Sequence, residues 1–220
     1  MGPLSRKGPA LAALAADIAV VPESPRLPSI DDRNLWFGDN RNKGLAVYAG
    51  QAFTLAPVDG LPELPRYVVP IQVSGPMSFL LLAVWMQADG ADKYVRGLNR
   101  AVDLCRSAIA AQPTVVMGDF NANAIWDQGH PADSNHSALV RRLTSLGLVS
   151  AYHSYHGEEQ GAESHPTFFF RHSVKAPFHI DYCFVPTEWR AGIKDVRVGE
   201  FAEWRPFSDH MPLICDVSPQ

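Results

Sequence analysis

The chain has 220 residues, of which 46% are hydrophobic and 19% charged, and its net charge is −4. This length and composition suit one globular domain over residues 1–220 with a substantial core. The negative balance excludes a protein that coats nucleic acid through a general basic excess, although a nuclease needs basic residues on only one face.

In chain order, apolar periodicity first predicts a short helix and then a series of strands separated by polar, Pro-rich segments. A pair of strands is expected to turn at the sequence SGPM, residues 74–77. The expected elements of this half are a helix over 9–18, strands over 17–24, 44–50, 67–73 and 78–85, and irregular connections over 25–43 and 51–66.

The second half opens with the clearest helical pattern of the chain, in which Val95, Leu98 and Val102 fall on one stripe. A second helix is expected to stop at Gly147. The expected elements are helices over 92–111 and 137–147 and strands over 114–117, 167–172, 178–185, 194–198 and 211–217. Many strands with few, widely separated helices favour two stacked sheets with helices outside them.

The cysteines give no metal or disulfide motif: Cys105, Cys183 and Cys215 are widely spaced and odd in number. This spacing favours free thiols in a reducing compartment. Pro9 and Asp17 interrupt the apolar N-terminal stretch, so we expect no signal peptide. No apolar run approaches the ~18 residues that span a bilayer. These features predict a soluble, cytoplasmic protein.

Acidic residues recur where the predicted strands end or begin. Residues two apart on a strand share a face, so Asp119 and Asn121 are expected to point the same way, as are His179 and Asp181. Asp181 lies in an otherwise apolar run and needs a partner, for which His210 is the natural choice. The acidic residues of this pattern are Glu23, Asp119, Asp181 and Asp209.

Each of these residues alone also fits an ordinary turn or helix-cap role. His179 alone fits a hydrogen-bonded structural histidine, and the remaining histidines form no tight metal spacing. Taken together, oxygen ligands at several strand ends suit a hard cation such as Mg²⁺, which binds one or two carboxylates and a phosphate.

Three motifs in order, GDFN at 118–121, HIDYCF at 179–184 and SDHMPL at 208–213, resemble those of the endonuclease/exonuclease/phosphatase superfamily. Glu23 in AVVPES matches the glutamate that ends the second strand of that family. The superfamily includes DNase I, abasic-site nucleases, sphingomyelinases and inositol phosphate phosphatases. The resemblance spans nearly the whole chain and implies a DNase I-like sandwich of two mixed β-sheets with flanking helices.

The resemblance also implies hydrolysis of a phosphate ester with Mg²⁺ or Mn²⁺ as cofactor. Carried over by matched position, Glu23 and Asp209 bind or orient the metal. Asp119 positions or deprotonates the attacking water, and Asn121 helps to hold the water or the phosphate. His210 donates to a phosphate oxygen, and Asp181 orients His210.

The chain departs from the family pattern in two places. Family members open with a strand ending in Trp-Asn, and no such strand follows Met1, so we expect that the first strand is missing and the chain is a fragment or starts at an internal Met. Trp85 stands where many members have a His or Tyr that contacts phosphate, and Gln87 is a candidate replacement.

The loop after GDFN is rich in Asn, Asp and His. Asn123 and His136 are candidate substrate-binding residues, and Trp126 could stack on a base. The same residues also fit a polar loop held by Asx turns. A second candidate substrate loop contains Trp36 and Lys43.

The leading hypothesis is a metal-dependent phosphodiesterase that acts on nucleic acid, without a membrane span and without an obligate protein partner. A phosphatase or diesterase for a small molecule or lipid headgroup is the alternative enzyme, because the sequence has no basic stripe. A non-catalytic binding protein on the same fold is the alternative of a different class, and it rests on the missing strand and on Trp85.

Overall fold

The computed structural model of the chain describes residues 3–88 and 93–219. Its helices are α1 (Pro3–Ala13), α2 (Val95–Leu104), α3 (Arg106–Ala111), α4 (His136–Ser145), α5 (Ala151–His156) and α6 (Phe201–Trp204). Its strands are β1 (Ile18–Ser24), β2 (Asn34–Asn40), β3 (Lys43–Ala49), β4 (Thr54–Pro57), β5 (Val68–Ser74), β6 (Phe79–Trp85), β7 (Thr114–Asp119), β8 (Leu148–Ser150), β9 (Phe168–Phe169), β10 (Pro177–Phe178), β11 (Asp181–Pro186), β12 (Ile193–Val198) and β13 (Leu213–Val217).

A mixed sheet of six strands, in the order β4-β5-β6-β7-β11-β8, forms the middle layer. Its strands pair antiparallel except β6 and β7, which run parallel and are joined through α2 and α3. The expected turn between the strands now labelled β5 and β6 is confirmed. Both faces of β6 are covered, which explains its unbroken apolar sequence FLLLAVW.

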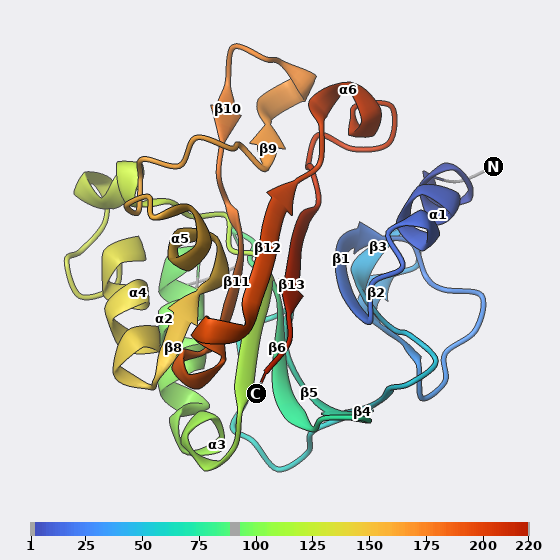
Figure 1. Cartoon of the computed structure of the whole chain (residues 1–220), viewed down its shortest axis with the longest axis horizontal. Helices are drawn as coiled ribbons and strands as arrows, with labels where there is room; N and C mark the ends of the chain where they lie inside the picture. The colour runs from blue at the N-terminus through green and yellow to red at the C-terminus, as the bar shows by residue number, and fades with distance from the viewer. Residues whose placement is uncertain (1–2, 89–92, 220) are drawn as a thin grey trace.

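Helices α2, α3 and α4 cover the outer face of this sheet, where Leu80 and Leu82 of β6 pack against Leu98 and Leu139 (Figure 1). The inner face, with Leu81 and Ala83, packs against a second layer. That layer consists of the three-stranded sheet β1-β3-β2 and the separate hairpin β12-β13. The predicted sandwich of mixed sheets with flanking helices is therefore confirmed.

Several expected boundaries were wrong. The segments 25–43 and 51–66, expected to be irregular, contain β2 and β4, because pairing with β3 and β5 overrides their turn-like composition. The helix expected over 92–111, whose first residue lies outside the described residues, is divided at Cys105 into α2 and α3. The first helix lies earlier than expected, over Pro3–Ala13.

The C-terminal half also differs in detail. The segment 167–172 forms only the two-residue β9 followed by a 3-10 turn, and the run 178–185 is divided between β10 and β11. The predicted stop at Gly147 is confirmed, since its φ of 78° ends α4 in a left-handed conformation. No helix in the described ranges is long and apolar enough to cross a membrane.

Candidate active site

One row of side chains crosses the end of the six-stranded sheet. Trp85 of β6 lies beside Asp119 of β7, and Asp119 lies opposite Asp181 of β11. Two residues earlier in β7, Met117 pairs with Cys183 and packs with it in the inner core. Because strand residues two apart share a face, the row lies on the inner face, where the core gives way to polar side chains.

Asp119, Asp181 and His210 form one cluster, in which one ligand atom from each residue lies within 4.8 Å of the others. His210 comes from the segment between α6 and β13, and its Nδ1 lies 2.9 Å from Asp181 Oδ2. The partner expected for Asp181 is therefore found. Two carboxylates and an imidazole at this spacing could hold a metal ion or act on one substrate atom.

The turn after β7 is built to fix the Asp119 carboxylate. Asn121 takes the left-handed φ of 47°, which asparagine tolerates, and its backbone N–H and Nδ2 donate to the two Asp119 oxygens at 2.8 and 2.7 Å. Its Nδ2 also donates to Met86 O at 2.8 Å, which ties the turn to the end of β6. The two side chains therefore lie together, but through this turn and not through a shared strand face as predicted, because β7 ends at Asp119.

Gly118 is required immediately before this turn. Its φ is +134°, and a Cβ placed there would lie 2.0 Å from the carbonyl oxygen of Val84. Only glycine allows β7 to run this close to β6. The first residue of the GDFN motif therefore serves the backbone, and the second and fourth form the hydrogen-bonded pair at the candidate site.

Thr167 and Phe168 position the other half of the cluster. The buried Thr167 Oγ1 accepts hydrogen bonds from the backbone N–H of Ile180 and Asp181, and Thr167 O accepts one from Met211 N at 2.7 Å. The Phe168 ring packs on the His210 ring with a centroid distance of 4.6 Å. The segment before β9 thereby sets both the start of β11 and the position of His210.

The cluster carries strongly shifted protonation equilibria. Burial and the adjacent Asp181 carboxylate raise the pKa of Asp119 well above its usual value. Burial alone would lower the pKa of His210, but the charge and hydrogen bond of Asp181 outweigh it and raise that pKa to about 9. His210 is therefore protonated at neutral pH, and the crowded carboxylates favour a proton or a cation between them.

Glu23 and Asp209, the predicted metal ligands, lie at the rim of this cluster and are not members of it. Glu23, at a φ of 56°, forms an ion pair with Lys43 Nζ at 2.8 Å. Its charge nevertheless contributes to raising the pKa of Asp119, and Asp209 contributes to raising that of His210. Their role as ligands stays a prediction.

Asn123 and His136, the predicted substrate contacts, are only 3% and 1% exposed. Asn123 Nδ2 donates to Glu163, to His179 O and to the Tyr182 hydroxyl, and its Oδ1 accepts from Ile125 N. The structure gives both residues positions in a buried polar network rather than on the site surface, and substrate contact stays a prediction for them.

The same network corrects the expectation for His179. It precedes β11 in a loop, and its Nδ1 lies 2.8 Å from His165 O, so its side chain does not share a strand face with Asp181.

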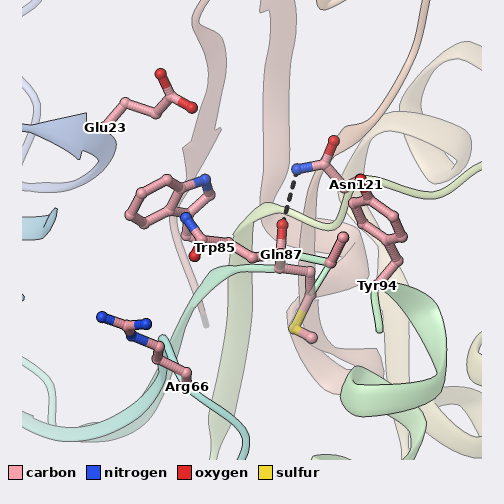
Figure 2. A pocket seen from close by; sticks show the side chains of 8 residues that line it. Glu23, Arg66, Trp85, Gln87, Tyr94 and Asn121 are labelled. Atoms are coloured by element: carbon pink, nitrogen blue, oxygen red, sulfur yellow. Dashed lines mark hydrogen bonds between the residues drawn. The ribbon is translucent and has the colours of Figure 1, made fainter. Parts of the chain in front are cut away.

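Three residues near the site were missed as site residues. Thr167 carries no sequence signal beyond its place before an aromatic run. Arg66 and Tyr94 lie beside strand and helix ends and are recognised only from the cavity that they line with Glu23 and Asn121 (Figure 2). Lys43, by contrast, lies in the expected second substrate loop.

A sequence profile of the Endonuclease/Exonuclease/phosphatase family matches residues 25–210. The chain belongs to this family. Its members are phosphoesterases that include nucleases and phosphatases. No curated protein sequence matches the chain. The profile match begins after Glu23, and the absence of a first family strand stays a prediction.

Solved structures agree with this fold. The 3′ phosphatase NExo from Neisseria, bound to a product DNA hairpin, aligns with a TM-score of 0.67 at 21% identity, covering 98% of this chain and 95% of that one. An AP endonuclease from Archaeoglobus fulgidus aligns at 0.67 and 18% identity, over 96% and 92%. The AP endonuclease LMAP from Leishmania major aligns at 0.69 and 11% identity, over 99% and 84%.

Proposed function

We propose that the protein is a metal-dependent phosphodiesterase that acts on nucleic acid. The observation that carries this proposal is the cluster of Asp119, Asp181 and His210 within 4.8 Å on the inner edge of the sheet. Membership of a phosphoesterase family and a fold shared with a DNA-bound phosphatase support the reaction class and the substrate.

In the proposed reaction Asp119 accepts the proton of the attacking water. Its carboxylate is held in place by the two hydrogen bonds from Asn121, so the accepting oxygens need no reorganisation when substrate arrives. The raised pKa of Asp119 makes its carboxylate a stronger base than an ordinary aspartate, which suits a general base.

His210 is the proposed donor to the phosphate. With Nδ1 directed at Asp181, its Nε2–H is left to donate to a non-bridging oxygen, where negative charge increases as water attacks phosphorus. Asp181 fixes the orientation of the ring and stabilises its charged form.

Mg²⁺ or Mn²⁺ would be held by the Asp119 and Asp181 carboxylates of the cluster, with Glu23 and Asp209 as further proposed ligands. When bound, the ion supplies charge neutralisation at the phosphate and lowers the pKa of a bound water.

The test is turnover of bis-p-nitrophenyl phosphate with Mg²⁺ or Mn²⁺. We expect turnover that stops with EDTA and falls at least ~100-fold in Asp119→Ala and in His210→Ala. Asp195→Ala, on the exposed part of β12, is the matched control and should retain full activity. Unchanged turnover in both site variants would reject the site.

Substrate class is tested by comparing plasmid DNA, RNA, DNA with a 3′ phosphate and small phosphomonoesters under one condition. Preference for DNA or RNA supports the proposal. Preference for a small monoester would instead assign a phosphatase, and absence of any turnover would favour a binding protein on this fold. The cytoplasmic location also stays a prediction.

A further inference from the structure

A cavity of about 520 Å³ opens directly beside the cluster, on the side of β6 (Figure 2). Asn121, which holds Asp119, and Glu23 form its boundary toward the site. Its remaining walls include Trp85 and Gln87 at the end of β6, Tyr94 just before α2, and Arg66 just before β5.

The walls combine aromatic rings with hydrogen-bonding groups. Trp85 forms the floor, is 2% exposed, and is held by Tyr67 at a ring-centroid distance of 4.6 Å. Figure 2 shows its indole nitrogen on the side that faces the space between Glu23 and Asn121. Tyr94, 39% exposed, lies on the opposite wall. Because Trp85 is almost fully buried, it offers the cavity its N–H rather than a ring face, and Tyr94 offers the exposed ring on which a flat ligand with polar edges can pack.

The backbone around this cavity is strained. Positive φ values occur at Glu23, Tyr94 and Asn121, which line the cavity, and at Tyr67, which packs on its floor, with φ between 47° and 61°. Non-glycine residues in this region cost free energy and collect at ligand sites. Tyr94 is held there by its N–H, which donates to Gln87 O at 2.9 Å.

Two basic side chains lie at the entrance, and each is ion-paired with a carboxylate. Arg66, ion-paired with Asp39, lines the lower wall, and Lys43 Nζ lies 5.4 Å from the Trp85 ring centroid. A ligand that carries a phosphate beside a flat ring would meet both features at once.

We propose that this cavity binds the nucleoside attached to the scissile phosphate, with the base packed on the Tyr94 ring and the Trp85 N–H donating to a base or sugar oxygen. The inference rests on the proposed function, because the phosphate of the same nucleotide would lie at Asp119 and His210. It assigns nucleotides as the substrate class, in preference to inositol or lipid headgroups. Tyr94 and Trp85 become the residues that determine this preference.

The test measures binding by calorimetry with Mg²⁺ present, using thymidine 5′-monophosphate, myo-inositol 1-phosphate and methyl phosphate as probes. We expect the nucleotide to bind at least tenfold tighter than the other two. Tyr94→Ala should weaken nucleotide binding at least fivefold, as loss of a stacked ring does. Trp85→Phe, which keeps a ring but removes the N–H, should also weaken it.

Matched controls are Tyr155→Ala, an exposed tyrosine on α5, and Trp189→Phe, a buried tryptophan of the inner core. Both should bind the nucleotide like the wild type. Equal binding of the nucleotide and methyl phosphate, tighter binding of the inositol phosphate, or unchanged binding in Tyr94→Ala would overturn the inference.

Turnover of bis-p-nitrophenyl phosphate separates the two proposals. If the wild type binds the nucleotide but hydrolyses no diester, the cavity assignment holds and the enzyme assignment is rejected. If the wild type hydrolyses diesters but Tyr94→Ala leaves nucleotide affinity unchanged, the enzyme assignment holds and the cavity assignment is rejected.

Discussion

His210 Nδ1 lies 2.9 Å from Asp181 Oδ2, although the two residues are 29 positions apart and come from different layers of the sandwich. Asp181 opens β11 in the six-stranded sheet, and His210 precedes β13 in the opposite layer. This pair connects the two layers at the site. Because Asp181 raises the pKa of His210, the imidazole stays positively charged next to two carboxylates.

Asp181→Asn should lower the pKa of His210 from about 9 by at least one unit, because it removes the charge that outweighs burial. A raised folded-state pKa stabilises the fold below the unfolded value of about 6.5, and this contribution is lost as pH rises through about 9. NMR titration of the metal-free protein measures the shift. Asp195→Asn is the control, and a His210 pKa that does not move would contradict the pairing.

Lys43→Gln should tighten Mn²⁺ binding, since the ammonium competes with the ion for Glu23. Both side chains are about half exposed, so the pair is worth only about 0.2–1 kcal/mol and the affinity should rise no more than about fivefold. Manganese EPR titration measures the affinity. Lys194→Gln, on β12, is the control. Weaker Mn²⁺ binding in Lys43→Gln would show that Lys43 supports the ion rather than competing with it.

Gly118→Ala should destabilise the fold by at least about 3 kcal/mol or prevent folding, because its Cβ would meet Val84 O at 2.0 Å. Gly147 also has a positive φ, +78° against +134°, but a Cβ there would meet no atom within 4 Å, so Gly147→Ala should cost only about 1 kcal/mol. Urea unfolding measures both. Equal costs would mean that the strands separate easily and that the close approach is not needed.

Glu163→Gln should destabilise the fold by about 1–3 kcal/mol at neutral pH. Burial would raise the pKa of Glu163, but hydrogen bonds from His153, Asn123 and Gly161 N lower it to about 2. A lowered pKa stabilises the fold above the unfolded value of about 4.5, and this contribution is lost as pH falls toward about 2.

Urea unfolding between pH 7 and about 3 checks this prediction, and Glu163→Gln should lose part of the acid dependence. Glu188→Gln, an exposed residue after β11, should behave like the wild type. A variant with unchanged acid dependence would mean that the network around Asn123 does not rely on the Glu163 charge.

The class of the fold and the pairing of Asp181 with His210 were predictable from the sequence, whereas several individual elements were not. Asp119 and Asn121 were recognised because they follow an apolar run at a spacing of two. Asp181 was recognised because a carboxylate in an apolar run needs a partner. Nothing local marked β2, whose sequence NLWFGDN reads as a turn and becomes a strand by pairing with β3. Tertiary pairing decides such segments.

The rule that strand residues two apart share a face gave a wrong prediction where the strand was shorter than its apolar run. His179 and Asp181 are two apart, yet β11 begins at Asp181 and His179 turns toward His165. Asn123 and His136 looked like surface residues because their loop is polar, but distant partners such as Glu163 and Gln160 bury them. Long-range polar networks produce no periodic pattern in a sequence, so they cannot be predicted from it.

The division of the second layer into two separate sheets has a dynamic consequence. Glu23 and Lys43 belong to the β1-β3-β2 sheet, whereas Asp119 and Asp181 belong to the central sheet. A sub-global opening of the N-terminal sheet would remove the rim carboxylate and leave the acid–imidazole cluster intact. In the proposed enzyme, the fraction of molecules competent to bind metal would then follow a local opening equilibrium, and activity would be lost at lower denaturant concentrations than the fold.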